Sequence, residues 1–175
     1  LAAYQNGNAT FDIILRDDGG TGYGGADNYS VASAFTVAVL PVNDQPYFEI
    51  SIPVLDVLEG AMNHTFDGVA TGMAKGPNAN EDNQSLTFVV VLRDGDANLF
   101  EPWGLPAMAD NGSVTFALTQ YQNGNAEFAV TLVDDGGVKN GGHDKYTILG
   151  AFEVRAVPVN QAPTFMLGSS ECLFG

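Results

Sequence analysis

The chain has 175 residues, of which 45% are hydrophobic, and it carries six basic against twenty-one acidic side chains, a net charge of −15. This charge excludes nucleic acid as a partner, because nucleic-acid binding requires clustered Lys and Arg. No apolar run is long enough to cross a membrane. With a single cysteine, Cys172, there is no disulfide framework, so the fold must be stabilised by core packing, ions or neighbouring domains.

A long stretch of the chain occurs twice. Residues 4–20, YQNGNATFDIILRDDGG, return at 121–137 as YQNGNAEFAVTLVDDGG. The offset is 121 − 4 = 117 residues, and it continues without a gap to the PVN of 41–43 and of 158–160. A period of this length is the size of a whole domain and too long for a solenoid repeat. The sequence therefore predicts tandem domains with a period of about 117 residues.

This period sets the predicted domain boundaries. We expect residues 1–47 to be the C-terminal half of one repeat, 48–164 to be a complete repeat, and 165–175 to begin the next. Because the sequence starts and stops within a repeat, we expect it to be a piece of a longer protein. No signal peptide is visible at its start.

Strand patterns dominate the chain. Apolar residues alternate with polar or small ones, which is typical of half-buried strands, at 86–92, 114–118, 128–132 and 152–156. Val89 and Val91 make the first of these strands apolar on both faces. Asn-Gly, Asp-Gly, Gly-Gly and proline-rich turn signals separate the strands, and no segment has a helical stripe. About seven short strands per repeat predict an all-β, two-sheet Greek-key sandwich.

Several short motifs recur at fixed places in this pattern. They are LRDDGG and LVDDGG after a strand, a Gly-Gly-x-Asp loop, and the closing PVNDQPYF. Together they resemble the cadherin-like, immunoglobulin-like repeats of very large surface proteins, over nearly all of 48–164. The resemblance implies secreted, rod-like arrays that serve in adhesion or as structural stalks, often with Ca²⁺ at the junctions.

Matching the motifs residue by residue, the resemblance implies Ca²⁺ ligands for the first junction: Asn43, Asp44, Asp82 (with Asn80 or Glu81 as the alternatives to it), Asp135 and Glu59. Pro41 stands where the linker's first Asp would be, and Gln161 replaces the Asp at the second junction. Calcium requires six to eight oxygen ligands, including several carboxylates. The alternative is turn chemistry alone, because Asp beside Gly-Gly commonly bonds its own backbone.

The chain also contains five Asn-x-Ser/Thr sequons, at Asn8, Asn28, Asn63, Asn83 and Asn111. Such sites carry N-linked glycans in proteins that pass through a eukaryotic secretory pathway. The alternative is that an Asn-rich, turn-rich sequence meets Ser and Thr by chance.

The sequence contains few residues in patterns suited to catalysis, and we expect that the protein is not an enzyme. His64 and His143 are the only histidines and do not have the spacing of a zinc site. Trp103 is expected to plug one end of the sandwich, with stacking on a sugar as the alternative.

The predicted function is a structural segment of a secreted or cell-surface stalk, fibre or filament. The expected partners are neighbouring repeats of the same protein, and self-assembly into a filament belongs to the same prediction. The alternative is an adhesion or receptor module that binds a protein or glycan through its loops.

Overall fold

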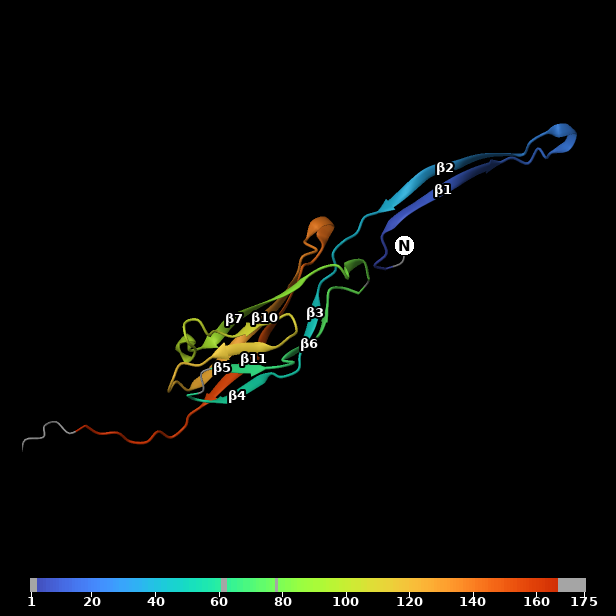
Figure 1. The fold of residues 1–175 in the computed structure, drawn as a ribbon. Helices are drawn as coiled ribbons and strands as arrows, with labels where there is room; N and C mark the ends of the chain where they lie inside the picture. The colour runs from blue at the N-terminus through green and yellow to red at the C-terminus, as the bar shows by residue number, and fades with distance from the viewer. Residues whose placement is uncertain (1–2, 61–62, 78, 167–175) are drawn as a thin grey trace, which may run out of the picture.

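The computed structural model describes residues 3–60, 63–77 and 79–166, and it confirms the all-β prediction (Figure 1). The strands are β1 (Gly7–Arg16), β2 (Asn28–Val39), β3 (Tyr47–Ile50), β4 (Val54–Leu58), β5 (Asn63–Phe66), β6 (Ala70–Ala74), β7 (Leu86–Gly95), β8 (Ala107–Met108), β9 (Val114–Ala117), β10 (Gly124–Asp134) and β11 (Lys145–Val157). Between them lie single 3-10 turns, and the described residues contain no helix long and apolar enough to span a membrane. Cys172 and most of 165–175 lie outside the described residues.

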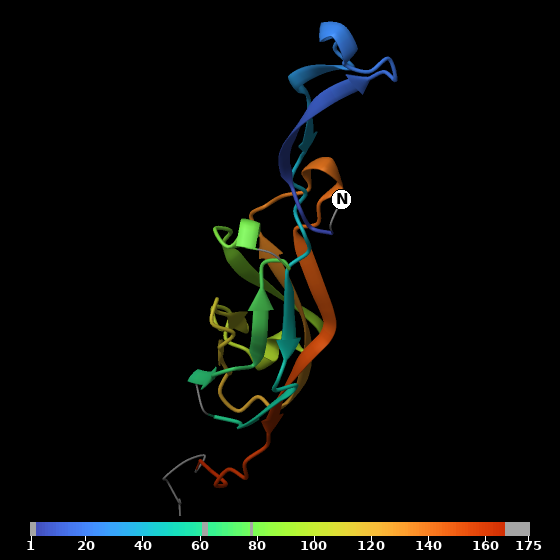
Figure 2. The same ribbon diagram turned by 90° about the vertical axis from the view of Figure 1, so that its right-hand side faces the viewer.

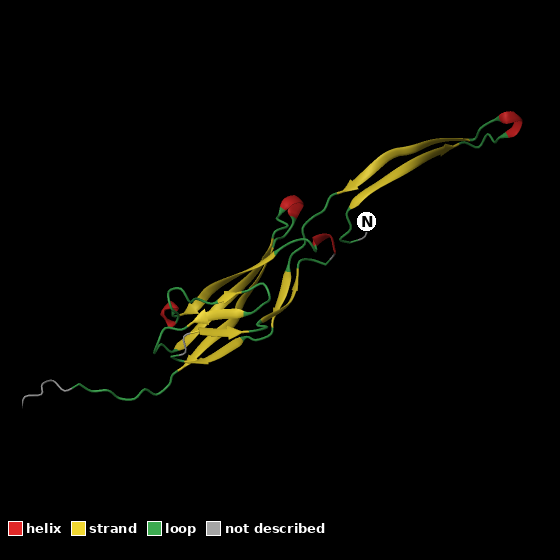
Figure 3. Cartoon of the chain, viewed as in Figure 1, coloured by secondary structure: helices red, strands yellow, loops and turns green. Residues whose placement is uncertain are grey.

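The strands from β3 to β11 form one body with a shared core. A four-stranded sheet of order β4-β11-β10-β7 faces the pair β3-β6 and the three-stranded sheet β5-β9-β8 (Figures 2 and 3). Phe48 of β3, Val114 of β9 and Phe128 of β10 are at most 1% exposed and belong to the same hydrophobic cluster. The alternation read from the sequence therefore places its apolar residues on inward faces, as expected for a sheet with one buried side.

One segment joins the two layers of this body. β3 pairs antiparallel with β6, whereas β4, three residues later, pairs parallel with β11. The change falls at Pro53, which has no N–H to continue a ladder but whose carbonyl accepts a hydrogen bond from Glu153 N (2.9 Å). This division, together with the two-residue strand β8, explains why the body contains more strands than the seven expected.

The first two strands stand apart from this body. β1 and β2 form an antiparallel hairpin that extends from one end of it, while the residues after β11 leave from the opposite end (Figure 1). A seven-residue linker, 40–46, runs from β2 to β3. The chain therefore enters and leaves the body at opposite ends, and the linker is where two structural units meet.

Candidate functional site

The linker is held to the body by one asparagine. The Asn43 side-chain amide donates to Asp134 Oδ1 (2.9 Å) and to the His143 carbonyl (2.7 Å), and its oxygen accepts from Gln84 Nε2 (2.6 Å). The Asn43 backbone carbonyl accepts from His143 N (3.0 Å). One residue thus joins the linker to the end of β10, to the loop before β11 and to the loop before β7. We call these contacts the Asn43 clamp.

Glycines make room for the Asn43 clamp. A Cβ on Gly136 would collide with Asn43 Oδ1 and Gln84 Nε2, and a Cβ on Gly142 would lie 2.9 Å from Asn43 Cβ. Neither glycine has a positive φ, so any residue type could adopt its backbone conformation. One glycine of each Gly-Gly pair, Gly136 or Gly142, is therefore needed here for close approach to the linker, whereas Gly137 and Gly141 have a positive φ and open space around them.

Two buried carboxylates lie beside this linker. Glu81 is 3% exposed and accepts from Asp44 N (2.7 Å) through Oε1, while Asp134 is 5% exposed. Glu81 Oε2, Asp134 Oδ2 and the nearby Gln84 Oε1 are buried without a hydrogen-bond partner. Unpartnered buried oxygens are costly and call for a physical explanation, such as an ion or water. The junction therefore has acceptor capacity that the described side chains do not use.

The predicted metal ligands are only partly brought together. Asn43 and Asp44 lie in the linker, but Asp135 is exposed and accepts from Ser85 N (2.9 Å). Asp82 is also exposed, and its backbone carbonyl accepts from Lys75. Within 3–60, 63–77 and 79–166, no three His, Cys, Asp or Glu side chains gather as a metal-holding group.

The two members of the acidic pair Asp134–Asp135 lie in different environments, and the buried one is not the predicted ligand Asp135. On β10, Phe128, Val130 and Leu132 point inward, and the same period of two brings Asp134 inward and Asp135 outward. Asp134 Oδ1 also accepts from Gly136 N (2.8 Å), which is the turn chemistry expected for Asp beside Gly-Gly. The alternation of β10 was the signal that identifies Asp134.

Glu59 lies far from the other four predicted ligands. It follows β4, near the point where the chain leaves the body, and accepts from Asn123 Nδ2 (2.8 Å) and Gln161 Nε2 (3.4 Å). The Val159 backbone N–H, followed by Asn123 and Gln161, lowers the pKa of Glu59 from its ordinary value of 4.5. Glu59 therefore belongs with the residues that follow β11, around Val159 and Gln161.

This lowered pKa predicts a pH dependence. A carboxylate with a depressed pKa in the folded state contributes stability above its unfolded pKa, and this is lost as the pH falls through the folded value. Near neutral pH, Glu59→Gln should therefore have a lower melting temperature than the wild type, and the difference should vanish well below pH 4.5. Thermal unfolding of both proteins across this range measures it. A constant difference at every pH would contradict the assignment.

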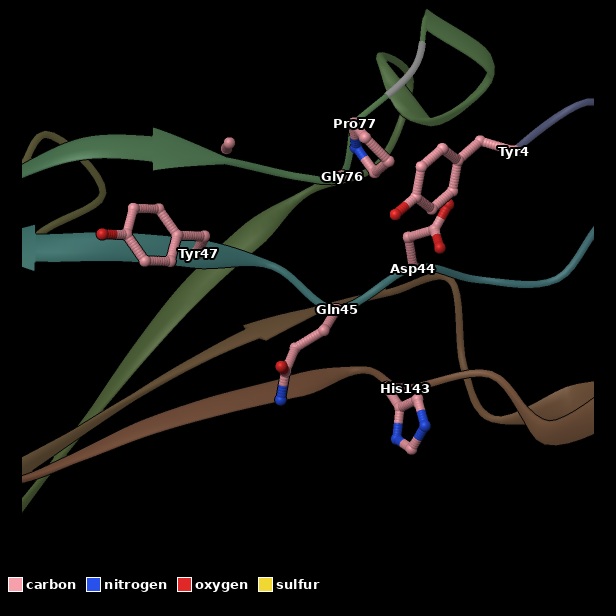
Figure 4. Close-up of a pocket in the computed structure, with 8 residues that line it drawn as sticks. Tyr4, Asp44, Gln45, Tyr47, Gly76, Pro77 and His143 are labelled. Atoms are coloured by element: carbon pink, nitrogen blue, oxygen red, sulfur yellow. The ribbon is translucent and has the colours of Figure 1, made fainter. Parts of the chain in front are cut away.

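A hollow of about 480 Å³ opens at the same junction (Figure 4). Tyr4, from the segment before β1, lines it together with Asp44 and Gln45 of the linker, and His143 lies on the other side of the linker. Tyr47 also lines it and donates to Glu49 (2.9 Å), which raises the pKa of the Tyr47 hydroxyl. The junction thus combines residues from the hairpin unit and from the body.

The sequon asparagines are all exposed: Asn8, Asn28, Asn63, Asn83 and Asn111.

Trp103 is also exposed, at 71%, so the expectation that it plugs the sandwich is wrong. Gly104 packs so tightly on Ala117 that a Cβ would lie 2.6 Å from Ala117 Cβ, which draws the backbone onto β9. The indole is left outside, beside Leu105 and Asn63, at a hollow of about 340 Å³.

No protein-family model, curated protein or solved structure matches this chain. The function of the chain must therefore be inferred from the sequence repeat and from the geometry of the junction.

Proposed function

We propose that this chain is a structural segment of a long extracellular stalk, fibre or filament built from tandem repeats. The observation that carries the proposal is the Asn43 clamp, which fixes the linker to the next unit through four hydrogen bonds. A linker held in this way transmits orientation from one unit to the next, whereas a flexible tether between independent domains does not. The entry and exit of the chain at opposite ends of the body favour a linear array (Figure 1).

In this proposal the repeat is a Greek-key sandwich of the cadherin-like or immunoglobulin-like kind, with a period of about 117 residues. Residues 48–164 form one repeat, 1–47 complete the preceding one, and 165–175 begin the next. Secretion and N-linked glycans belong to the same proposal, supported by five sequon asparagines that all lie at the surface.

Electron microscopy of the natural protein tests this function. Antibodies raised against this chain would capture it from its source, with and without enzymatic removal of N-glycans. We expect an unbranched thread of regularly spaced beads and a loss of mass on glycan removal. Compact particles that hold a single copy of the sandwich would contradict the stalk.

We also propose that a Ca²⁺ ion stiffens the first junction. Three buried oxygens without a partner would suit a hard cation: one carboxylate oxygen each of Glu81 and Asp134 and the side-chain carbonyl of Gln84. Asp44, in the linker, is hydrogen-bonded to Glu81 through its backbone N–H. Bound Ca²⁺ would neutralise the two buried carboxylates and connect the linker to the loops before β7 and after β10. Further oxygens would come from water, from Asp44 or from the preceding repeat.

Calcium should therefore raise the melting temperature of the chain, and excess chelator should reverse the rise. Mass action gives about 2.7 kcal/mol of stabilisation at a hundredfold excess over Kd. Glu81→Gln should abolish the rise, while Asp82→Asn, next to it but exposed, should keep it. Calorimetric titration with CaCl₂ provides a second readout. An equal rise in wild type and Glu81→Gln would contradict this site.

A second function has one observation in its favour. An adhesion module needs an exposed aromatic surface away from the junctions, and Trp103 and Leu105 are 71% and 51% exposed. Trp103 is the single tryptophan, so its fluorescence reports on this surface alone. Titration with oligosaccharides should change the emission if the surface binds glycans by stacking, and Trp103→Ala should lose the binding. Unchanged emission throughout would contradict glycan binding here.

A further inference from the structure

The hairpin β1–β2 repeats the backbone of β10–β11 residue by residue. Phe11 pairs with Phe35 as Phe128 pairs with Phe152, and the two aromatic pairs stack at 5.0 and 5.2 Å. In both hairpins the register shifts just after this pair. Ser33 even takes the positive φ of its counterpart Gly150, with its N–H donating to Asp12 Oδ1 (2.7 Å). The hairpin therefore has the shape of a strand pair from the centre of a sheet.

Its side chains have the same pattern but a different environment. Phe128, Leu132 and Val154 are at most 1% exposed, whereas their counterparts are 44%, 71% and 42% exposed. These counterparts are Phe11, Leu15 and Val37, at an offset of 117 residues. A patch of large apolar side chains exposed in this way marks an interaction surface. The two free strand edges add unpaired backbone groups.

The body shows what covers such a hairpin. The outer edge of β10 pairs antiparallel with β7, with Phe128 opposite Leu92 and Leu132 opposite Phe88. The outer edge of β11 pairs parallel with β4. Phe48, Val114 and other residues of the facing sheets complete the cover. All these strands belong to residues 47–117, the half of the repeat that comes before the hairpin.

We propose that β1–β2 is the docking surface for a half-sandwich with the pattern of 48–117, supplied by residues that precede Leu1 in the same polypeptide. A strand like β7 pairs antiparallel with β1, and a strand like β4 pairs parallel with β2. This inference rests on the proposed tandem organisation and names its partner, strand by strand.

A second copy of the chain is a poorer occupant. Its own 48–117 half is already covered by its β10 and β11, whose Phe128 and Phe152 are each 1% exposed. Its hairpin is a two-stranded sheet without a facing sheet, so it cannot supply this cover.

The turn at the tip of the β1–β2 hairpin has the same hydrogen bond as the turn between β10 and β11. Asp17 Oδ1 accepts from Gly19 N (2.8 Å) as Asp134 Oδ1 accepts from Gly136 N (2.8 Å). At Gly136 a Cβ would collide with Asn43, whereas at Gly19 it would meet only Asp17. The place that Asn43 takes at the second tip is thus open at the first, and the linker asparagine of the preceding repeat would lie there.

The experiment adds a second copy of 48–117 directly before Leu1 of the full chain and measures amide hydrogen exchange. In the extended protein the β1 and β2 amides should exchange slower by a factor of about 100 or more than in the 175-residue chain, because they join a cooperative unit. Phe11→Ala in the extended protein should reverse this protection. The body, β3 to β11, serves as the internal reference.

Ile13 and Val39 are larger than their counterparts Val130 and Ala156, so the added half could be overpacked. The double variant Ile13→Val, Val39→Ala matches the two hairpins at these positions. If neither extended protein protects β1 and β2, the proposal is overturned. It is also overturned if the 175-residue chain forms a dimer in which β1 and β2 are already protected. If β1 and β2 are protected in the extended protein but electron microscopy shows no beads in the natural protein, the docking proposal stands and the stalk function is rejected.

Discussion

Phe128→Ala is expected to lower the free energy of unfolding of the body by about 3–5 kcal/mol, the usual cost of truncating a buried Phe. Phe128 is 1% exposed, stacks on Phe152 at 5.2 Å and meets the edge of Phe100 at 5.6 Å. It lies on β10, which pairs with both β7 and β11. The cavity would therefore open in the middle of the four-stranded sheet.

The matched control is Phe11→Ala, the same substitution at the same place in the repeat. Phe11 is 44% exposed in the hairpin and lies outside the core cluster of the body. Its removal should change the unfolding of the body by less than about 0.5 kcal/mol, as is usual for surface positions. Urea unfolding of the wild type and both variants measures the difference. Equal losses would show that the hairpin is already part of the core.

Gly136→Ala is expected to destabilise the body by about 2 kcal/mol, because it displaces the Asn43 clamp. The new methyl group would occupy the place of Asn43 Oδ1 and Gln84 Nε2. Moving them removes the hydrogen bonds of Asn43 to Asp134 and of Gln84 to Asn43 and leaves more buried polar atoms unpaired. Each buried polar group without a partner costs about 1–3 kcal/mol.

Gly19→Ala is the control at the equivalent turn. A Cβ there approaches only Asp17 Oδ1, at 3.1 Å, because no linker lies against this tip. We therefore expect almost no effect on the unfolding of the body, measured by the same urea titration. If Gly136→Ala were as mild as Gly19→Ala, the linker would not be packed against the turn after β10.

Local patterns predicted much of this fold. Alternation identified the inward residues of β7, β9, β10 and β11, and the offset of 117 residues predicted that Phe11 and Phe35 stand where Phe128 and Phe152 do. Such patterns depend on residues a few positions apart and on a comparison of the chain with itself. Tertiary contacts are not needed to recognise them.

The site was less accessible to sequence reasoning. The Asn43 clamp joins residues 91 and 100 positions apart, and no local signal specifies such pairs. The sequence analysis named Asp135, whereas the buried carboxylate is that of Asp134, and one residue along a strand is the difference between the outer and the inner face. Trp103 was expected to plug one end of the sandwich, but close packing of Gly104 on Ala117 draws the neighbouring backbone onto β9, and the indole is left exposed.

Amide hydrogen exchange at Asp44 and His143 tests the junction most directly. Asp44 N donates to Glu81 Oε1 (2.7 Å) and His143 N donates to the Asn43 carbonyl (3.0 Å), although His143 itself is exposed. A fixed linker predicts that both amides are protected nearly as well as those of β10, and that Asn43→Ala weakens this protection while β10 stays protected. If both amides instead exchange as fast as an unstructured chain, the linker is a flexible tether and the proposed stiff array is wrong.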